Sequence, residues 1–312
     1  MSLKYRLFAL SLILVFLILP GCAQDKEDGE NEKGVKGVEI KAEVTNNNLY
    51  TTDSDINFQI QLNIINNGYY DVKASDILLT YSGYDKGLAE LYEAPQTFSK
   101  SNDEVLFGVT PLNPKGSAYP VFVEGNIHLP WASHEADFEY DMNLFIKYCY
   151  KYKTKLSTVV CIDPNQGYNS NSACKMKKLY PSGGQGAPIE FTEILPIVTS
   201  NKLAFQIYLK NSGNGLAFPV KGIFGSSYLQ NCENLEMKSE NYGQLTVKAT
   251  LGEKIVECSP SPVMVDYEGS YVVCNFGKPD SQSAYSTALN LETEYTYVDT
   301  ADAPVHVTFL KQ

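Results

Sequence analysis

Beyond its first 21 residues the sequence has no long apolar run, and it has little of what catalytic and metal sites are built from. The 312 residues include three histidines and one tryptophan. No Gly-x-Ser-x-Gly motif is present, so an esterase-like nucleophile is not indicated. Residues 134–138 begin like a zinc-protease helix but lack the second histidine one turn later. We therefore expect a protein that is not an enzyme and holds no cofactor or metal.

Positive charge and helical periodicity are also scarce. The chain has 25 Lys and Arg against 36 Asp and Glu, a formal net charge of −11. An acidic surface repels phosphate backbones, so nucleic acid is not an expected partner. Apolar residues at helical spacing are nearly absent, which indicates an all-β chain.

The one long apolar stretch, residues 7–19, ends at Leu19-Pro20-Gly21-Cys22 and follows the basic residues Lys4 and Arg6. At about 13 residues it is shorter than the roughly 20 that a transmembrane helix needs. A small residue before a single cysteine is typical of a lipoprotein signal, because the peptidase cuts after the small residue and the thiol carries the lipid. We predict a signal peptide over 1–21, a lipidated Cys22 that anchors the chain to a membrane, and an extracytoplasmic, cell-surface location. A cleaved signal without lipid is the alternative.

Residues 22–37 are rich in Asp, Glu, Lys, Asn and Gly and contain no aromatic residue. Such a segment buries too little apolar surface to fold. We predict a lipid anchor followed by a flexible, disordered tether that lifts the rest of the chain off the membrane.

After the tether, apolar and polar residues alternate with the period of two that is typical of half-buried strands, first at 56–64 and again at 203–209. Phe58-Gln59-Ile60 matches Phe205-Gln206-Ile207 (205 − 58 = 147), and Asn143-Leu144 matches Asn290-Leu291 at the same offset. A constant offset indicates a duplication. We predict two tandem immunoglobulin-like β-sandwich domains, 38–163 and 188–312, joined by a linker over 164–187.

Tyrosine is abundant, with 22 in the chain. Four of these residues lie on the inner face of the predicted strands and are expected in the core: Tyr148, Tyr150, Tyr295 and Tyr297. Others flank turns and are expected as exposed recognition residues for a protein or a glycan: Tyr69, Tyr70, Tyr81 and Tyr84.

Setting Cys22 aside leaves six cysteines: Cys149, Cys161, Cys174, Cys232, Cys258 and Cys274. No Cys-x-x-Cys pair occurs, so an even count in an exported chain predicts three disulfides rather than a zinc site. A turn near Lys155 would place Cys149 opposite Cys161, which favours that bridge together with Cys258–Cys274 and Cys174–Cys232. The alternative, Cys161–Cys174 with Cys149–Cys232, stays open.

One stretch, residues 125–141, combines His128 and His134 with Trp131 and four acids, Glu135, Asp137, Glu139 and Asp141. Imidazoles and carboxylates are metal ligands, so this is the one candidate for a metal-dependent enzyme. The two histidines lie on either side of Pro130-Trp131, which favours a loop closed by a Pro-Trp packing contact instead.

The cysteines lie in short runs with distinctive neighbours. The runs are Cys149-Tyr150-x-Tyr152-x-Thr154, Val160-Cys161-Ile162-Asp163-Pro164, Cys174, residues 183–188, residues 251–260, Cys274 and residues 284–291. They resemble a group of archaeal secreted proteins and lipoproteins of unassigned function, and the predicted sandwich units resemble the CARDB-like immunoglobulin domains of archaeal cell surfaces. The resemblance implies a fold and a location, and it brings no catalytic residues.

Together these features predict a non-catalytic, membrane-anchored lipoprotein that displays two domains for binding an envelope protein or a glycan. One alternative is an accessory subunit of an envelope or secretion complex. The other is a metal-dependent enzyme that uses the region of His128 and His134.

Overall fold

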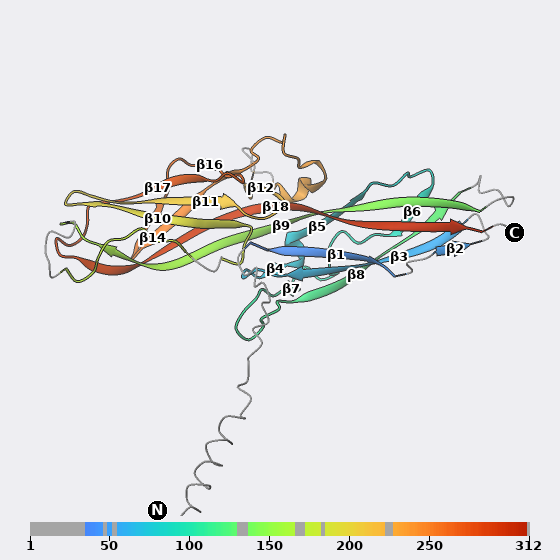
Figure 1. The fold of residues 1–312 in the computed structure, drawn as a ribbon, viewed down its shortest axis with the longest axis horizontal. Helices are drawn as coiled ribbons and strands as arrows, with labels where there is room; N and C mark the ends of the chain where they lie inside the picture. The colour runs from blue at the N-terminus through green and yellow to red at the C-terminus, as the bar shows by residue number, and fades with distance from the viewer. Residues whose placement is uncertain are drawn as a thin grey trace, which may run out of the picture. The chain divides into compact units, whose positions relative to one another are not determined.

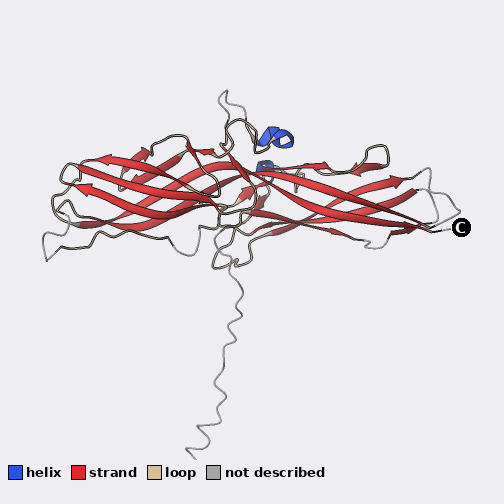
Figure 2. Cartoon of the chain, turned by 45° about the horizontal axis from the view of Figure 1, so that its top comes forward, coloured by secondary structure: helices blue, strands red, loops and turns tan. Residues whose placement is uncertain are grey.

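The computed structural model describes residues 35–45, 49–51, 55–129, 137–165, 172–181, 185–221 and 227–310. Within these ranges almost all regular structure is β-strand, drawn red in Figure 2, and helix is limited to two short 3-10 segments, η1 (Ala74–Asp76) and η2 (Leu229–Asn234). The all-β prediction is confirmed. No helix in the described ranges is long and apolar enough to cross a membrane.

A seven-stranded sheet runs through the described part of the chain. Its main path is β15 (Lys254–Glu257), β14 (Val247–Leu251), β18 (Tyr285–Phe309), β9 (Phe138–Ile162) and β5 (Ile77–Ser82). Two short strands also pair with β18: β2 (Leu49–Thr51), which is parallel, and β12 (Leu216–Phe218), which is antiparallel.

Two smaller antiparallel sheets accompany it. One has the order β1 (Val38–Val44), β3 (Asp55–Asn66), β8 (Ala118–His128) and β6 (Ala89–Glu93). The other has the order β10 (Ile189–Thr199), β11 (Lys202–Asn211) and β17 (Ser270–Gly277). Two-stranded ladders are formed by β4 (Val72–Lys73) with β7 (Val105–Leu106) and by β13 (Gln244–Leu245) with β16 (Val263–Met264).

The alternating sequence pattern produces these sheets directly. Every second residue of β3 from Phe58 to Ile64 is buried, and so is every second residue of β11 from Leu203 to Leu209. These side chains join residues of the seven-stranded sheet in one hydrophobic cluster, so the fold is a β-sandwich. Each fully buried aliphatic or aromatic side chain contributes about 1.5–3 kcal/mol.

The longest elements are β9 and β18, each 25 residues long. They pair antiparallel without interruption, from Phe138 opposite Phe309 to Ile162 opposite Tyr285. In Figure 1 they run side by side, β9 in green and β18 in red. At the usual rise per residue this ribbon is about 80 Å long.

The predicted hairpin turn near Lys155 is wrong. Lys155 lies inside β9 and pairs with Glu292 of β18. The physical reason is visible in residues 147–162, which contain no Gly, Pro, Asn or Asp to form a tight turn. Apolar and polar residues alternate here because they belong to one continuous strand, not to two strands that pair with each other.

Each small sheet covers a different half of the same face of this ribbon. Tyr148, in the first half of β9, contacts the backbone of Ile40 in β1. Thr154, in the second half, donates a hydrogen bond to Ile189 O of β10 at 2.7 Å. Residues 32–312 accordingly form one compact unit, in which both predicted repeats share a continuous sheet. The boundaries at 163/164 and 187/188 stay predictions about where the repeats end.

Three disulfides are present, as predicted, but with the alternative connectivity: Cys149–Cys232, Cys161–Cys174 and Cys258–Cys274. The favoured Cys149–Cys161 and Cys174–Cys232 bridges are wrong. Because β9 is straight, Cys149 and Cys161 lie about 40 Å apart along it, far beyond the reach of a disulfide. Three disulfides indicate an oxidising, extracytoplasmic environment.

The Cys149–Cys232 bridge fastens η2 to the other face of the ribbon. Cys149 and Cys232 pack with Phe218, Leu235 and Val298 in a second, smaller hydrophobic cluster. The middle of the ribbon is therefore covered on both faces.

Candidate functional site

The predicted lipidation and metal residues are only partly described by the structure. Cys22, Trp131, His134 and Glu135 lie outside the described residues. His128 ends β8, and its Nδ1 lies 2.7 Å from Asp55 Oδ1 of β3. In the described ranges no group of three or more His, Cys, Asp or Glu side chains is arranged to hold a metal ion.

Asp141, one of the four acids grouped with His128 in the sequence, pairs with a different histidine. Asp141 lies in β9, where its Oδ1 is 2.7 Å from Nδ1 of His306 in β18. Both imidazoles thus belong to exposed His–Asp pairs that link neighbouring strands. The hydrogen bond that His306 donates to Asp141 raises the pKa of His306.

A ladder of polar side chains covers the outer face of the four-stranded sheet. Asn126 Nδ2 donates to Asn57 Oδ1 at 3.1 Å, and Gln59 Nε2 donates to Glu124 Oε1 at 2.7 Å. Gln61 Nε2 continues the row by donating to Asn63 Oδ1 at 2.9 Å. The cross-strand pairing of β3 with β8 sets the first two contacts, and the third joins residues two apart on β3. The ladder presents both donors and acceptors to solvent.

A groove of about 980 Å³ lies beside this ladder. Its floor includes Gln59, Phe122 and Glu124, and its other wall is the segment 92–101 that follows β6. Two aromatic residues along it are exposed: Phe122 by 42% and Tyr92 by 58%.

The groove exists because β6 is shorter than β8. β6 pairs with β8 only at 124–127, so the edge of β8 from Ala118 to Val123 has no neighbouring strand in the described part of the chain. The register shifts between Leu91 and Glu93, a β-bulge that makes Tyr92 the extra residue. Pro120 lies in the open edge and has no N–H to offer an added strand.

The wall formed by residues 94–101 is held to the rest of the fold. Tyr81 Oη donates to Pro95 O at 2.5 Å, and Leu79 N donates to Gln96 O at 2.9 Å. The buried ring of Phe98 lies 5.4 Å from that of Tyr119, measured between centroids. The groove is therefore formed before any ligand arrives.

The tyrosines predicted from the sequence divide into two groups. The four expected in the core are buried, which confirms that prediction. Of the expected recognition residues, Tyr69 is 47% exposed, but Tyr81 is largely buried and hydrogen-bonded, and burial raises its pKa. Tyr81 supports the groove wall instead of contacting a ligand.

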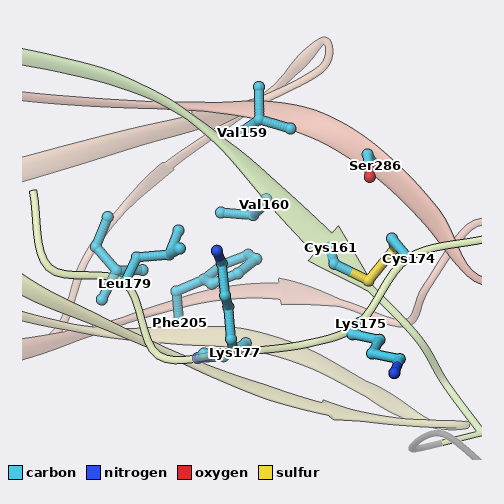
Figure 3. A pocket seen from close by; sticks show the side chains of 11 residues that line it. Val159, Val160, Cys161, Cys174, Lys175, Lys177, Leu179, Phe205 and Ser286 are labelled. Atoms are coloured by element: carbon cyan, nitrogen blue, oxygen red, sulfur yellow. A yellow bond between two sulfur atoms is a disulfide. The ribbon is translucent and has the colours of Figure 1, made fainter.

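A smaller cavity of about 200 Å³ lies where residues 174–179 cross the open edge between β9 and β10 (Figure 3). The Cys161–Cys174 disulfide closes one end, and Phe205 and Leu179 supply apolar walls. Lys177 extends toward Val160, whereas Lys175 points away. This cavity is mostly apolar and small, and it shows how part of the predicted linker packs against the sandwich.

The groove residues were not identified from the sequence. The sequence pattern of β3 indicates only a strand with one polar face, formed by Asn57, Gln59, Gln61 and Asn63. Phe122 and Tyr92 are isolated aromatic residues in the sequence. One signal was available: the outward positions of β3 from 57 to 63 are all carboxamides, where a solvated face usually carries charges.

No protein-family model and no curated protein matches the chain. Among solved structures, it is similar to the secreted serine protease VesC from Vibrio cholerae, at 10% sequence identity and a TM-score of 0.18. The match covers 86% of this chain and 51% of VesC, so the chain spans about half the length of that protein. A likeness this low carries no argument about activity. The resemblance to the archaeal group stays a prediction.

Proposed function

We propose that the protein is an exported lipoprotein, anchored through Cys22, that binds a neutral polysaccharide of the cell envelope in the groove beside β8. The observation that carries the proposal is the carboxamide ladder directly beside two exposed aromatic rings. The oxidising environment indicated by the disulfides agrees with an exported protein.

The chemistry of the groove suits sugars. A sugar hydroxyl donates and accepts a hydrogen bond. The side-chain amide of Gln59 in the groove, and the amides of Gln61 and Asn63 on the adjoining sheet face, offer both functions. The apolar C–H faces of a sugar ring pack on aromatic rings, here Phe122 and Tyr92. The open edge of β8 from Ala118 to Val123 is about 20 Å long, which suits an extended chain.

The negative charge of the groove disfavours anionic polymers, and the backbone of β8 disfavours an added peptide strand. Glu93 and Glu124 line the groove and the whole chain is acidic, which repels anionic polymers. A peptide that adds a strand needs a continuous row of backbone donors and acceptors, and Pro120 interrupts that row. A neutral glycan needs neither positive charge nor strand pairing.

Affinity electrophoresis tests the proposal. The protein is run through native gels that contain a neutral β-glucan, mannan or galactan, or the anionic polymer alginate. We expect at least one neutral polysaccharide to retard it and alginate not to. Replacing both Tyr92 and Phe122 by alanine should abolish the retardation, since aromatic anchors dominate such contacts.

The matched control replaces two other exposed aromatics on strands, Tyr271→Ala with Phe145→Ala, which lie away from the groove. This pair should leave retardation unchanged. Loss of retardation in the control but not in the groove variant would contradict the proposal. Release of reducing ends by the wild type would contradict the non-catalytic part, since Glu93 and Glu124 line the groove and glycosidases use two carboxylates.

A further inference from the structure

Four buried tyrosines meet at the middle of the β9–β18 ribbon: Tyr150, Tyr152, Tyr295 and Tyr297. Tyr150 lies opposite Tyr297, and Tyr152 lies opposite Tyr295. Neighbouring ring centroids are 5.6 to 6.3 Å apart. A phenol hydroxyl buried this deeply normally has a hydrogen-bond partner.

Three of the four hydroxyls have one. Tyr152 Oη donates to Gly186 O at 3.0 Å, Tyr295 Oη lies 2.9 Å from Thr154 Oγ1, and Tyr297 Oη accepts from Gly215 N at 2.8 Å. Tyr150, only 1% exposed, has no hydrogen-bond partner for its hydroxyl among the described residues. It is the exception within an otherwise satisfied cluster.

The end of the Tyr150 side chain lines a cavity of about 290 Å³ between the first residues of β1 and the 212–214 turn. A Cβ added at Gly37 would lie 2.6 Å from Tyr150 Oη, so a glycine is needed there to leave the hydroxyl free. Tyr148, Tyr297 and Asp299 are among the other lining residues, and so are the charged residues Lys36 and Glu39. The volume is at the lower end of the range for small-molecule sites.

The two carboxylates of the cavity differ in their partners. Glu39 lies 3.7 Å from Lys36 Nζ and accepts a hydrogen bond from Asn67 Nδ2 at 2.6 Å. Asp299 accepts hydrogen bonds from Thr300 N at 2.8 Å and from the Tyr148 hydroxyl, and no lysine, arginine or histidine of the described ranges pairs with it. Burial raises the pKa of Asp299. The cavity thus contains a carboxylate without a counter-ion beside a hydroxyl without a partner.

We propose that this cavity binds the primary ammonium group of a small organic cation, with Asp299 as its counter-ion and Tyr150 Oη as a hydrogen-bond acceptor. An ammonium group has three donors and no acceptor, which matches these two groups. The face of a surrounding tyrosine ring adds a further attraction for a cation placed over it. An anion would be repelled, and a neutral alcohol would leave Asp299 uncompensated. This site is separate from the groove and does not depend on the function proposed for it.

Calorimetric titration with matched probes tests the proposal on the whole exported chain. The probes are n-butylammonium, n-butanol and n-butyrate, in about 0.15 M NaCl so that sodium is in excess. We expect butylammonium to bind and the other two to bind at least about tenfold more weakly. Equal binding of butanol, or no binding of butylammonium, would overturn the proposal.

Two variants locate the binding site. Asp299→Asn keeps the shape and removes the charge, and it should weaken binding at least about tenfold. Tyr150→Phe should weaken it about threefold to tenfold while leaving Tm unchanged, because its hydroxyl has no protein partner to lose. Weaker binding with an unchanged Tm would show that the Tyr150 hydroxyl contacts the ligand and does not stabilise the fold.

The controls are residues of the same kind outside the cavity. Asp302→Asn alters an exposed aspartate on the same strand and should leave affinity unchanged. Tyr295→Phe removes the contact with Thr154, so it should lower Tm and leave affinity unchanged. An equal loss of affinity in Asp302→Asn and Asp299→Asn would refute the site.

The pH dependence gives an independent readout. Glu39 of β1, Tyr148 of β9, Tyr297 of β18 and Tyr267, which follows β16, are the titratable groups that interact with Asp299, and Lys36 lines the same cavity. The pKa of each of these tyrosines is raised, so all three stay neutral in acid. Because the pKa of Asp299 is raised above the usual value of about 3.9, affinity should fall as pH is lowered from about 7.5 toward about 4.5. Glu39→Gln should keep that fall, and a flat profile in the wild type would contradict the role of Asp299.

Discussion

Two asparagines, Asn66 and Asn211, organise equivalent turns at the centre of the molecule. Each side-chain oxygen accepts from the N–H of a glycine two residues later, Gly68 or Gly213, both at 3.2 Å. Each side-chain amide donates to a carbonyl four residues later, at 2.7 Å to Tyr70 and 2.8 Å to Gly215. These hydrogen bonds recur at an offset of 145 (211 − 66), two fewer than the offset of the strand motifs. A shortening of two residues leaves every side chain on its original face of the strand.

The tyrosines that bind these turns show how the repeats have diverged. Tyr152 Oη lies 3.4 Å from Asn66 Oδ1, and Tyr297 Oη donates to Asn211 Oδ1 at 3.0 Å. At the same offset Tyr150 corresponds to Tyr295, yet only Tyr295 has a hydroxyl partner, Thr154. The unpartnered Tyr150 therefore reflects a difference between the repeats, at the position where we place the ammonium site.

The anchor is also a prediction about a single residue. Intact-mass spectrometry of protein extracted from native membranes should show a chain that begins at Cys22 and carries a lipid adduct. Each acyl methylene that enters the membrane contributes about 0.8 kcal/mol of affinity, so the adduct accounts for retention. Cys22→Ser should lack the adduct, whereas Cys258→Ser should keep it. An unmodified wild-type chain would contradict the anchor.

At the scale of elements, the sequence predicts which residues form strands, but it does not predict where one strand ends and the next begins. The alternation at 56–64 places Phe58 and Ile60 in the core of β3, as found. The same period of two runs through 138–162, but a period does not tell one long strand from a hairpin. The absence of turn-forming residues around Lys155 was the distinguishing signal, and it also determines which cysteines meet.

The groove depends on features that leave little trace in sequence. β6 must end at Glu93, opposite Glu124, so that the part of β8 from Ala118 to Val123 is left without a partner on that side. A bulge at Tyr92 is also required. Element ends and bulges are set by tertiary packing, here by the contact of Tyr81 with Pro95. Sequence alone therefore predicts the sheet and not the groove on its edge.

The disulfides should differ in their contribution to stability according to the chain that each one closes. Cys149–Cys232 spans a sequence separation of 83 and Cys161–Cys174 one of 13. Loop-closure entropy predicts losses of about 4.5 kcal/mol for the double alanine variant of the first pair and about 3 kcal/mol for that of the second. Urea unfolding of both variants measures the order. A larger loss for the Cys161–Cys174 variant would show that chain entropy does not control the difference.

At the scale of the whole molecule, β9 and β18 each contribute to both sandwich halves, so the two predicted repeats exchange strands within one chain. The second half of β9 completes the sandwich formed by β10, β11 and β17, and the second half of β18 returns to the sandwich formed by β1, β3, β8 and β6. Each half would expose a long unpaired strand edge without the other. Both proposed sites depend on this arrangement, because the ammonium cavity lies at the crossing and the groove lies on one half.

The most direct test of this account is whether the repeats stay together after the chain between them is cut. A protease site is inserted between Pro181 and Gln185, the folded protein is cleaved, and Cys149–Cys232 is reduced under native conditions before size-exclusion chromatography with light scattering. Strand exchange predicts a single 1:1 complex of the two fragments with the mass of the intact chain. Two folded fragments that elute separately would contradict it.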